Sequence, residues 1–210
     1  MIRVRAEDVS GLDRRPGWEP AAEALRRGEV VIVPTDTVYG VGVTVWNDEA
    51  VGRLFEVKGR ERGKPIAVLV ADVEQAERIA QLDAIARRLI ERFWPGALTL
   101  VLPRRAEFTA ILGGDRASVG LRCPHHPALA QLLADVGPMA VTSANRAGEP
   151  TPATAAAAAA ALEGATVVVD GGTLGGLAST VVDCTGPFPE VLREGTVTRE
   201  HIRAALSDLL

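Results

Sequence analysis

Short runs of β-branched, apolar residues alternate with helical stretches along most of the chain, and this alternation most constrains the fold. Such a pattern is typical of α/β layer folds, in which helices pack on a sheet. We therefore predict an α/β (α+β) fold. The expected strands cover residues 30–33, 66–70, 98–102, 119–122, 139–143, 167–170, 180–184 and 191–193. The expected helices cover 18–27, 47–57, 83–93, 129–136, 155–161 and 202–209, and a further helix starts at Asp72.

The size and composition of the chain predict one domain over residues 1–210. A chain of 210 residues with 47% apolar residues is long enough to bury a core of its own. Its longest apolar runs fall short of the roughly 20 residues that cross a bilayer, and the N-terminus lacks the apolar stretch of a signal peptide. We expect a cytoplasmic protein without membrane contact. Cys123 and Cys184 lie far apart in the sequence and are expected to be buried fillers.

The net charge and the positions of rare residue types limit the functions that the chain can have. A net charge of −4 argues against a broad, non-specific nucleic-acid surface, although a local basic cleft stays possible. The two lysines, Lys58 and Lys64, both fall in the segment KGRERGKP. The one tyrosine, Tyr39, lies in PTDTVYG, and Asn145, one of two asparagines, lies in TSAN. Rare residue types that gather in segments predicted to be loops indicate a catalytic or ligand-binding site.

The polar candidates lie at expected strand or helix ends, where α/β sheets usually bind their ligands. Lys58 and Arg60 would place two cations in one loop, as a polyphosphate requires, although a solvated charge run is the plainer alternative. Ser143 and Asn145 offer a hydroxyl and an amide just past an apolar strand, suited to a phosphate or a ribose. Alone, TSAN is more often a plain turn.

Two further segments could bind a small polar ligand. PTDTVYG, which reads as a loop opened by Pro34, contains Thr35, Asp36 and Thr37, although a threonine-rich strand exit is usually only a turn. Arg122, at the end of the strand in SVGLRCP, could bind a carboxylate through two hydrogen bonds. Its alternative is a surface ion pair.

Several well-known motifs are absent from the sequence. It contains no GxxxxGK[ST] phosphate loop, no GxGxxG after a strand and no GxSxG nucleophile elbow, so ATP would have to be held in another way. Cys123, His125 and His126 are crowded onto one turn between prolines, which disfavours a shared metal ion. We assign no metal ligand. GGTLGG, over residues 171–176, reads as a flexible turn that could let a backbone approach a ligand.

The order and spacing of the motifs carry more information than any one of them. PTDTVYGVG, KGRERGKP, SVGLRCP, TSAN and STVVD resemble, in this order, the YrdC family of L-threonylcarbamoyladenylate synthases, from about residue 20 to 195. The resemblance implies a twisted open mixed sheet with packed helices and a large concave cleft. The chain resembles the short form of the family, without the C-terminal domain of the longer members.

The resemblance also implies a reaction. Family members condense L-threonine with bicarbonate, and the carbamate attacks the α-phosphorus of ATP, with Mg²⁺, to give threonylcarbamoyl-AMP and pyrophosphate. A downstream threonylcarbamoyl transferase then modifies an adenosine in tRNA. By similarity, Lys58, Arg60, Ser143 and Asn145 form the catalytic and ATP-binding tetrad. The resemblance further assigns Ser118, Thr151 and Arg193 to ATP, and Thr37, Arg122 and Ser179 to threonine.

Two departures from the family and two rival functions remain. Leu69 stands where the longer members have a histidine, and Glu61 where a proline is common. The main rival is a module that binds double-stranded RNA or tRNA without catalysis. The second rival is the carbamoyltransferase of hydrogenase maturation, which also contains a YrdC-like domain. That protein's acylphosphatase and zinc-finger segments are missing here.

Overall fold

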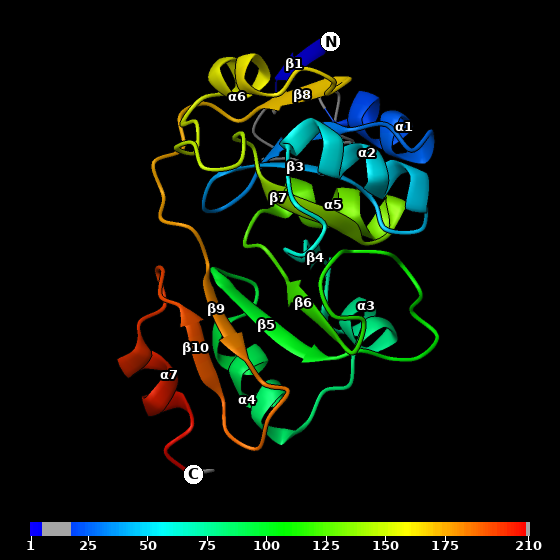
Figure 1. Cartoon of the computed structure of the whole chain (residues 1–210). Helices are drawn as coiled ribbons and strands as arrows, with labels where there is room; N and C mark the ends of the chain where they lie inside the picture. The colour runs from blue at the N-terminus through cyan, green and yellow to red at the C-terminus, as the bar shows by residue number, and fades with distance from the viewer. Residues whose placement is uncertain (6–17, 209–210) are drawn as a thin grey trace.

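The computed structural model describes residues 1–5 and 18–208, whose strands form one mixed sheet (Figure 1). The strand order is β1-β8-β2-β3-β7-β4-β6-β5-β9-β10, with parallel and antiparallel neighbours. The mixed α/β fold predicted from the sequence is therefore confirmed. The strands are β1 (Ile2–Arg5), β2 (Val31–Pro34), β3 (Tyr39–Thr44), β4 (Ala67–Leu69), β5 (Leu98–Pro103), β6 (Ser118–Arg122), β7 (Met139–Ser143), β8 (Val167–Asp170), β9 (Thr180–Asp183) and β10 (Glu190–Arg193).

The helices lie close to the predicted segments, and polar side chains fix where several of them begin. They are α1 (Glu19–Arg26), α2 (Asp48–Lys58), α3 (Val73–Ile79), α4 (Ala84–Phe93), α5 (Pro127–Val136), α6 (Ala155–Ala161) and α7 (Arg199–Ala205). The Asn47 side chain accepts a hydrogen bond from the Ala50 amide at 3.0 Å and so starts α2. Asp72 starts α3 in the same way, through the Gln75 amide at 2.8 Å. No helix of the described residues is long and apolar enough to cross a membrane.

Apolar side chains cover both faces of the sheet. Along β2, Ile32 belongs to the larger buried cluster, whereas Val31 and Val33 belong to the smaller one. Successive side chains of a strand point to opposite faces, so the two clusters lie on the two sides of the sheet. The larger cluster includes side chains of α2, α3 and α4, and the smaller one includes those of α1 and α5.

The observed elements differ from the sequence predictions at three places. Strand β1 was not predicted, since its side chains are mostly exposed and its pairing partner, β8, lies far away in the sequence. PTDTVYG is not a loop throughout, because Tyr39 already begins β3, and β2 and β3 form an antiparallel hairpin. Helix α7 starts at Arg199, where Thr198 caps it, rather than at residue 202. Residue 209, the predicted end of that helix, lies outside the described residues.

Candidate active site

The first cluster of polar residues forms around Lys58, the last residue of α2. Gly59 follows in the left-handed conformation, with φ of 62°, and ends the helix. The Lys58 side chain is buried and donates to the Ser143 carbonyl at 2.6 Å, the Ser143 hydroxyl at 3.3 Å and the Asn145 side-chain oxygen at 3.0 Å. It also donates to the Asn145 carbonyl. The structure thus brings together Lys58, Ser143 and Asn145 from two distant segments.

Electrostatics at Lys58 favour a bound anion. Burial and, to a smaller extent, the nearby Arg60 cation lower the pKa of Lys58 to about 8, whereas Glu149 opposes the shift. The oxygens that contact the ammonium group are neutral carbonyl, amide and hydroxyl oxygens. A buried cation that is paired only with neutral acceptors gains from an approaching negative charge.

The other residues predicted to bind the nucleotide differ in whether they contact the Lys58 cluster. The Thr151 hydroxyl donates to the Asn145 side-chain oxygen at 3.4 Å, so Thr151 is part of it. Arg60 acts on Lys58 electrostatically, but its guanidinium donates to the Lys64 and Pro65 carbonyls of its own loop, at 2.9 Å each. Ser118 begins β6, and its side chain makes no hydrogen bond with the described part of the chain.

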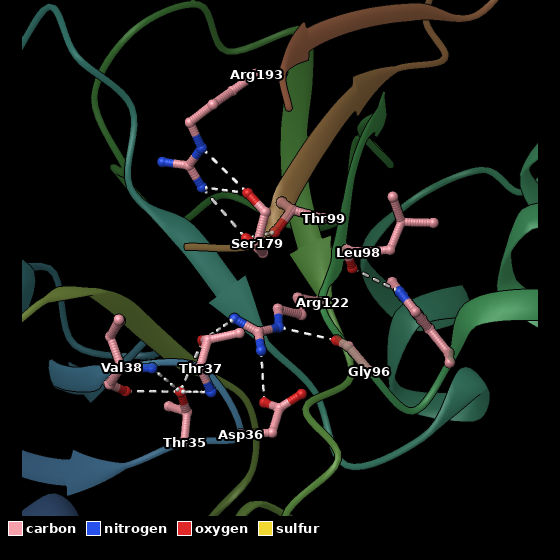
Figure 2. A network of polar contacts seen from close by, with 11 residues as sticks. Thr35, Asp36, Thr37, Val38, Gly96, Leu98, Thr99, Arg122, Ser179 and Arg193 are labelled. Atoms are coloured by element: carbon pink, nitrogen blue, oxygen red, sulfur yellow. Dashed lines mark hydrogen bonds and ion pairs between the residues drawn. The ribbon is translucent and has the colours of Figure 1, made fainter. Parts of the chain in front are cut away.

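The second cluster surrounds Arg122, the last residue of β6 (Figure 2). Its Nε donates to the Gly96 carbonyl at 2.9 Å, and its Nη1 donates to the Thr37 hydroxyl at 2.9 Å. Its Nη2 forms a buried ion pair with Asp36 at 2.5 Å. The Thr35 hydroxyl accepts from the Thr37 amide at 3.1 Å and holds this loop in a tight turn. The sequence alternative of a surface ion pair for Arg122 is therefore wrong, because the pair is buried.

The third cluster lies at the start of β9, and Figure 2 shows it beside Arg122. The hydroxyls of Thr99 and Ser179 are 2.9 Å apart, and both residues are buried. Arg193 of β10 donates from Nη2 to the Ser179 carbonyl at 2.7 Å and to its hydroxyl at 3.3 Å. Burial lowers the pKa of Arg122, and the nearby Arg193 cation lowers it further, so the second and third clusters face each other.

The hairpin of β2 and β3 joins the first two clusters. Gly40 of β3 pairs with Ser143 of β7, and the Ala144 amide donates to the Tyr39 carbonyl at 2.8 Å. The loop that carries Thr37 is therefore only three residues from the strand end that carries Ser143. Two segments that are about a hundred residues apart in the sequence meet at one end of the sheet.

Sequence reasoning missed Thr99, although a signal was present. Thr99 is the one polar residue in the apolar strand segment LTLVL, and such a residue needs a partner when it is buried. Asp36 was named only as part of a polar loop, and its pairing with Arg122 could not be predicted without the fold, because Arg122 lies 86 positions further along the sequence.

His126 and the two cysteines make contacts that are typical of residues with a structural role. The ring of His126 accepts from the Leu129 amide at 3.3 Å, which caps α5, and it packs against Trp18. Both cysteines are buried as predicted, and burial raises the pKa of Cys123 to about 11 and that of Cys184 to about 12. Leu69 packs in the smaller apolar cluster.

Comparison with known proteins identifies the family. The model of the Sua5/YciO/YrdC family, described as "Telomere recombination", matches residues 23–195. The chain belongs to the Sua5/YciO/YrdC family. This confirms the resemblance inferred from the motifs, and the matched range contains every member of the three clusters.

Two curated Sua5/YciO/YrdC relatives cover most of the chain. A putative threonylcarbamoyl-AMP synthase of Mycobacterium tuberculosis is 42% identical over 196 residues, which are 92% of this chain and 90% of the relative. The threonylcarbamoyl-AMP synthase of Bacillus subtilis is 40% identical over 199 residues, but the chain covers only 58% of its length.

A solved structure of the same Sua5/YciO/YrdC family has a closely similar fold. The crystal structure of P. abyssi Sua5 complexed with L-threonine superposes with a TM-score of 0.85 and 36% identity. The match covers 98% of this chain and 60% of the P. abyssi chain. The chain therefore spans about three fifths of that larger protein.

Proposed function

We propose that the chain is an L-threonylcarbamoyladenylate synthase, an enzyme that makes threonylcarbamoyl-AMP from L-threonine, bicarbonate and ATP. One observation carries the proposal: a buried guanidinium, Arg122, faces the Ser179–Arg193 pair, close to the strand end where Lys58 holds Ser143 and Asn145. This arrangement offers a carboxylate site beside a polyphosphate site. The names of the relatives agree with the synthase, and no observation favours an RNA-binding module.

The three clusters divide between two substrates. We assign the carboxylate of threonine to Arg122, with Thr37 and Ser179 beside it. We assign ATP to the tetrad of Lys58, Arg60, Ser143 and Asn145, and to Ser118, Thr151 and Arg193. Arg60 donates to the Lys64 and Pro65 carbonyls through Nε and Nη2, so both N–H groups of Nη1 and one of Nη2 stay available for a phosphate.

The reaction needs charge stabilisation more than covalent catalysis. Threonine and bicarbonate form a carbamate with loss of water, and a carbamate oxygen then attacks the α-phosphorus of ATP. The bond to the bridging oxygen of the β-phosphate breaks, and its electron pair leaves with pyrophosphate. Lys58 and Arg60 would stabilise the negative charge that grows on the phosphate oxygens. Both cysteines are buried thiols with raised pKa values, which suits a reaction without an enzyme nucleophile.

Mg²⁺ belongs to the proposal as a companion of ATP. The described residues hold no group of three or more acidic, histidine or cysteine side chains that could bind a metal ion. This fits Mg²⁺, which usually binds through substrate phosphates and water. Its chemistry would be to neutralise phosphate charge, and we assign no residue of this chain to it.

The remaining assignments follow from the same reaction. We infer that residues 1–210 act as one YrdC-like domain in the cytoplasm. Threonylcarbamoyl-AMP would pass to a threonylcarbamoyl transferase that modifies tRNA, so contact with tRNA would be indirect.

Release of pyrophosphate tests the function. Wild type should release it from ATP and Mg²⁺ only when L-threonine and bicarbonate are both present. Lys58→Ala should lose at least about 100-fold in rate, as expected when a preorganised charge is removed from the site. Lys64→Ala is the matched control, because the Lys64 side chain is exposed and pairs with Glu61, and it should keep the wild-type rate. Salt-sensitive RNA binding without any release would instead support the RNA-binding module.

A further inference from the structure

The ion pair between Asp36 and Arg122 is nearly sealed from water. The side chains are 13% and 8% exposed, respectively, and Nη2 of Arg122 lies 2.5 Å from Oδ1 of Asp36. The loop that carries Asp36 is held by the Thr35 hydroxyl, which accepts from the Val38 amide at 3.2 Å and donates to the Val38 carbonyl at 2.7 Å. The carboxylate of Asp36 is therefore positioned by the turn as well as by its partner.

Both members of the pair keep hydrogen-bonding capacity. A guanidinium has five N–H groups, and those of Arg122 that are engaged go to Gly96, Thr37 and Asp36, one from each nitrogen. One N–H on each terminal nitrogen stays available, which is enough for a carboxylate. On the other side, Oδ2 of Asp36 makes no hydrogen bond with any residue in the described ranges. The pair therefore offers two donors and a charged acceptor within one small site.

The charge balance of this site fits a zwitterion. Apart from Asp36, the titratable groups that act on Arg122 are Arg193 and the Cys123 thiol, which is neutral at pH 7 because burial raises its pKa to about 11. Asp36 is therefore the one acidic side chain that offsets Arg122 among the described residues. A carboxylate alone would meet the Asp36 charge as well as Arg122. A ligand with an ammonium beside its carboxylate pairs with both, which removes the penalty of a buried unpaired charge.

We infer that Asp36 is a substrate-binding residue that receives the α-ammonium of the amino acid through Oδ2, while Arg122 binds the α-carboxylate. The inference deepens the proposed function and rests on it for the position of threonine. Asp36 would make the site specific for free α-amino acids and would hold the nitrogen that, after its ammonium has lost a proton to solvent, attacks the carbon of bicarbonate.

Binding of two ligands to two proteins tests this role by calorimetry without ATP. The ligands are L-threonine and its α-hydroxy analogue, in which a hydroxyl replaces the amine. The proteins are wild type and Asp36→Asn, which keeps the size of the side chain and an oxygen for Arg122. The quantity to compare is the ratio of the two dissociation constants. A charge-assisted hydrogen bond predicts that Asp36→Asn reduces the preference for threonine by about tenfold or more.

The possible outcomes distinguish a failure of this inference from a failure of the proposed function. If Asp36 acts only by holding Arg122, both ligands lose affinity equally and the ratio is unchanged, which would overturn the inference but not the synthase. If wild type does not bind threonine at all, the proposed function fails and the inference with it. If Asp36→Asn does not fold, binding of the two ligands to wild type alone still tests the inference. Equal affinities of wild type for threonine and its α-hydroxy analogue would also overturn the role of Asp36.

Discussion

Nη2 of Arg193 donates to both the carbonyl and the hydroxyl of Ser179, at 2.7 and 3.3 Å. Arg193, which we assign to ATP, is thus hydrogen-bonded directly to Ser179, which we assign to threonine. Because these hydrogen bonds link Ser179 to Arg193, we expect occupation of either substrate site to change affinity at the other. Allosteric coupling of this kind is reciprocal for binding free energies.

Thr99→Val should weaken threonine binding selectively. The substitution keeps the shape of the side chain but removes the hydroxyl that lies 2.9 Å from Ser179. Loss of one such hydrogen bond costs roughly 0.5–1.5 kcal/mol, so KM for threonine should rise about twofold to tenfold, with KM for ATP nearly unchanged. Steady-state pyrophosphate release measures both constants. In a Ser179→Ala background the same substitution should have no further effect, and an additive loss would show that Thr99 acts elsewhere.

ATP affinity should fall as the pH rises through about 8. The pKa of Lys58 is lowered to about 8 in the folded protein, so Lys58 loses its positive charge near this pH. Binding measured by calorimetry between pH 7 and 9.5 should show the decline, and Lys58→Arg should abolish it, since arginine stays charged. Constant affinity across this range in wild type would contradict a role for the Lys58 charge.

The same shift has an opposite effect on stability. Between about pH 8 and 10.5 the unfolded chain keeps the Lys58 proton and the folded protein has released it. The contribution of Lys58 to the free energy of unfolding therefore increases with pH in this window. Urea unfolding of wild type and Lys58→Met should differ in their pH dependence there. Parallel pH profiles would argue against the lowered pKa.

Gly176→Ala should disturb the threonine site. A methyl group at Gly176 would overlap the carbonyl oxygen of Thr37, so the loop that holds Thr37 must shift. Overpacking of this kind typically costs about 1–3 kcal/mol of stability, and we expect threonine affinity to fall at least about fivefold. Gly175→Ala is the matched control, because a methyl group there meets nothing within 4 Å. Equal effects of the two substitutions would refute the contact as the cause.

Tyr39→Phe tests what holds the turn after β8. The phenol donates to the Gly172 carbonyl at 2.7 Å and accepts from the Gly171 amide at 3.0 Å. Its removal leaves two backbone groups without a partner and should destabilise the protein by about 1–3 kcal/mol in urea unfolding. A loss below about 0.5 kcal/mol would show that water replaces the hydroxyl.

The predictions from sequence succeeded where the signal was local. Asn47 and Asp72 start their helices through contacts three residues away, and the chain near them is enough to predict this. They failed where structure depends on distant partners. Strand β1 is mostly exposed and pairs with the distant β8, and residues 40–44 of β3 pair with the distant β7.

The candidate site shows the same difference between local signals and contacts with distant partners. Motif order was sufficient to name the family. The structure places Lys58 and Ser143, two of the residues predicted for the site, in contact. The partners of Arg122 were not predictable, because β6 and the hairpin of β2 and β3 are connected only through the sheet.

The place of β8 in the sheet has a consequence for synthesis on the ribosome. β8 lies between β1 and β2 and pairs in parallel with both, although it begins only at Val167. Strand β1 therefore has no edge to join until residues 167–170 have been translated. Long-range parallel pairing of this kind forms slowly and leaves strand edges open meanwhile. Protection of the growing chain by chaperones should therefore matter most before residue 170 has left the ribosome.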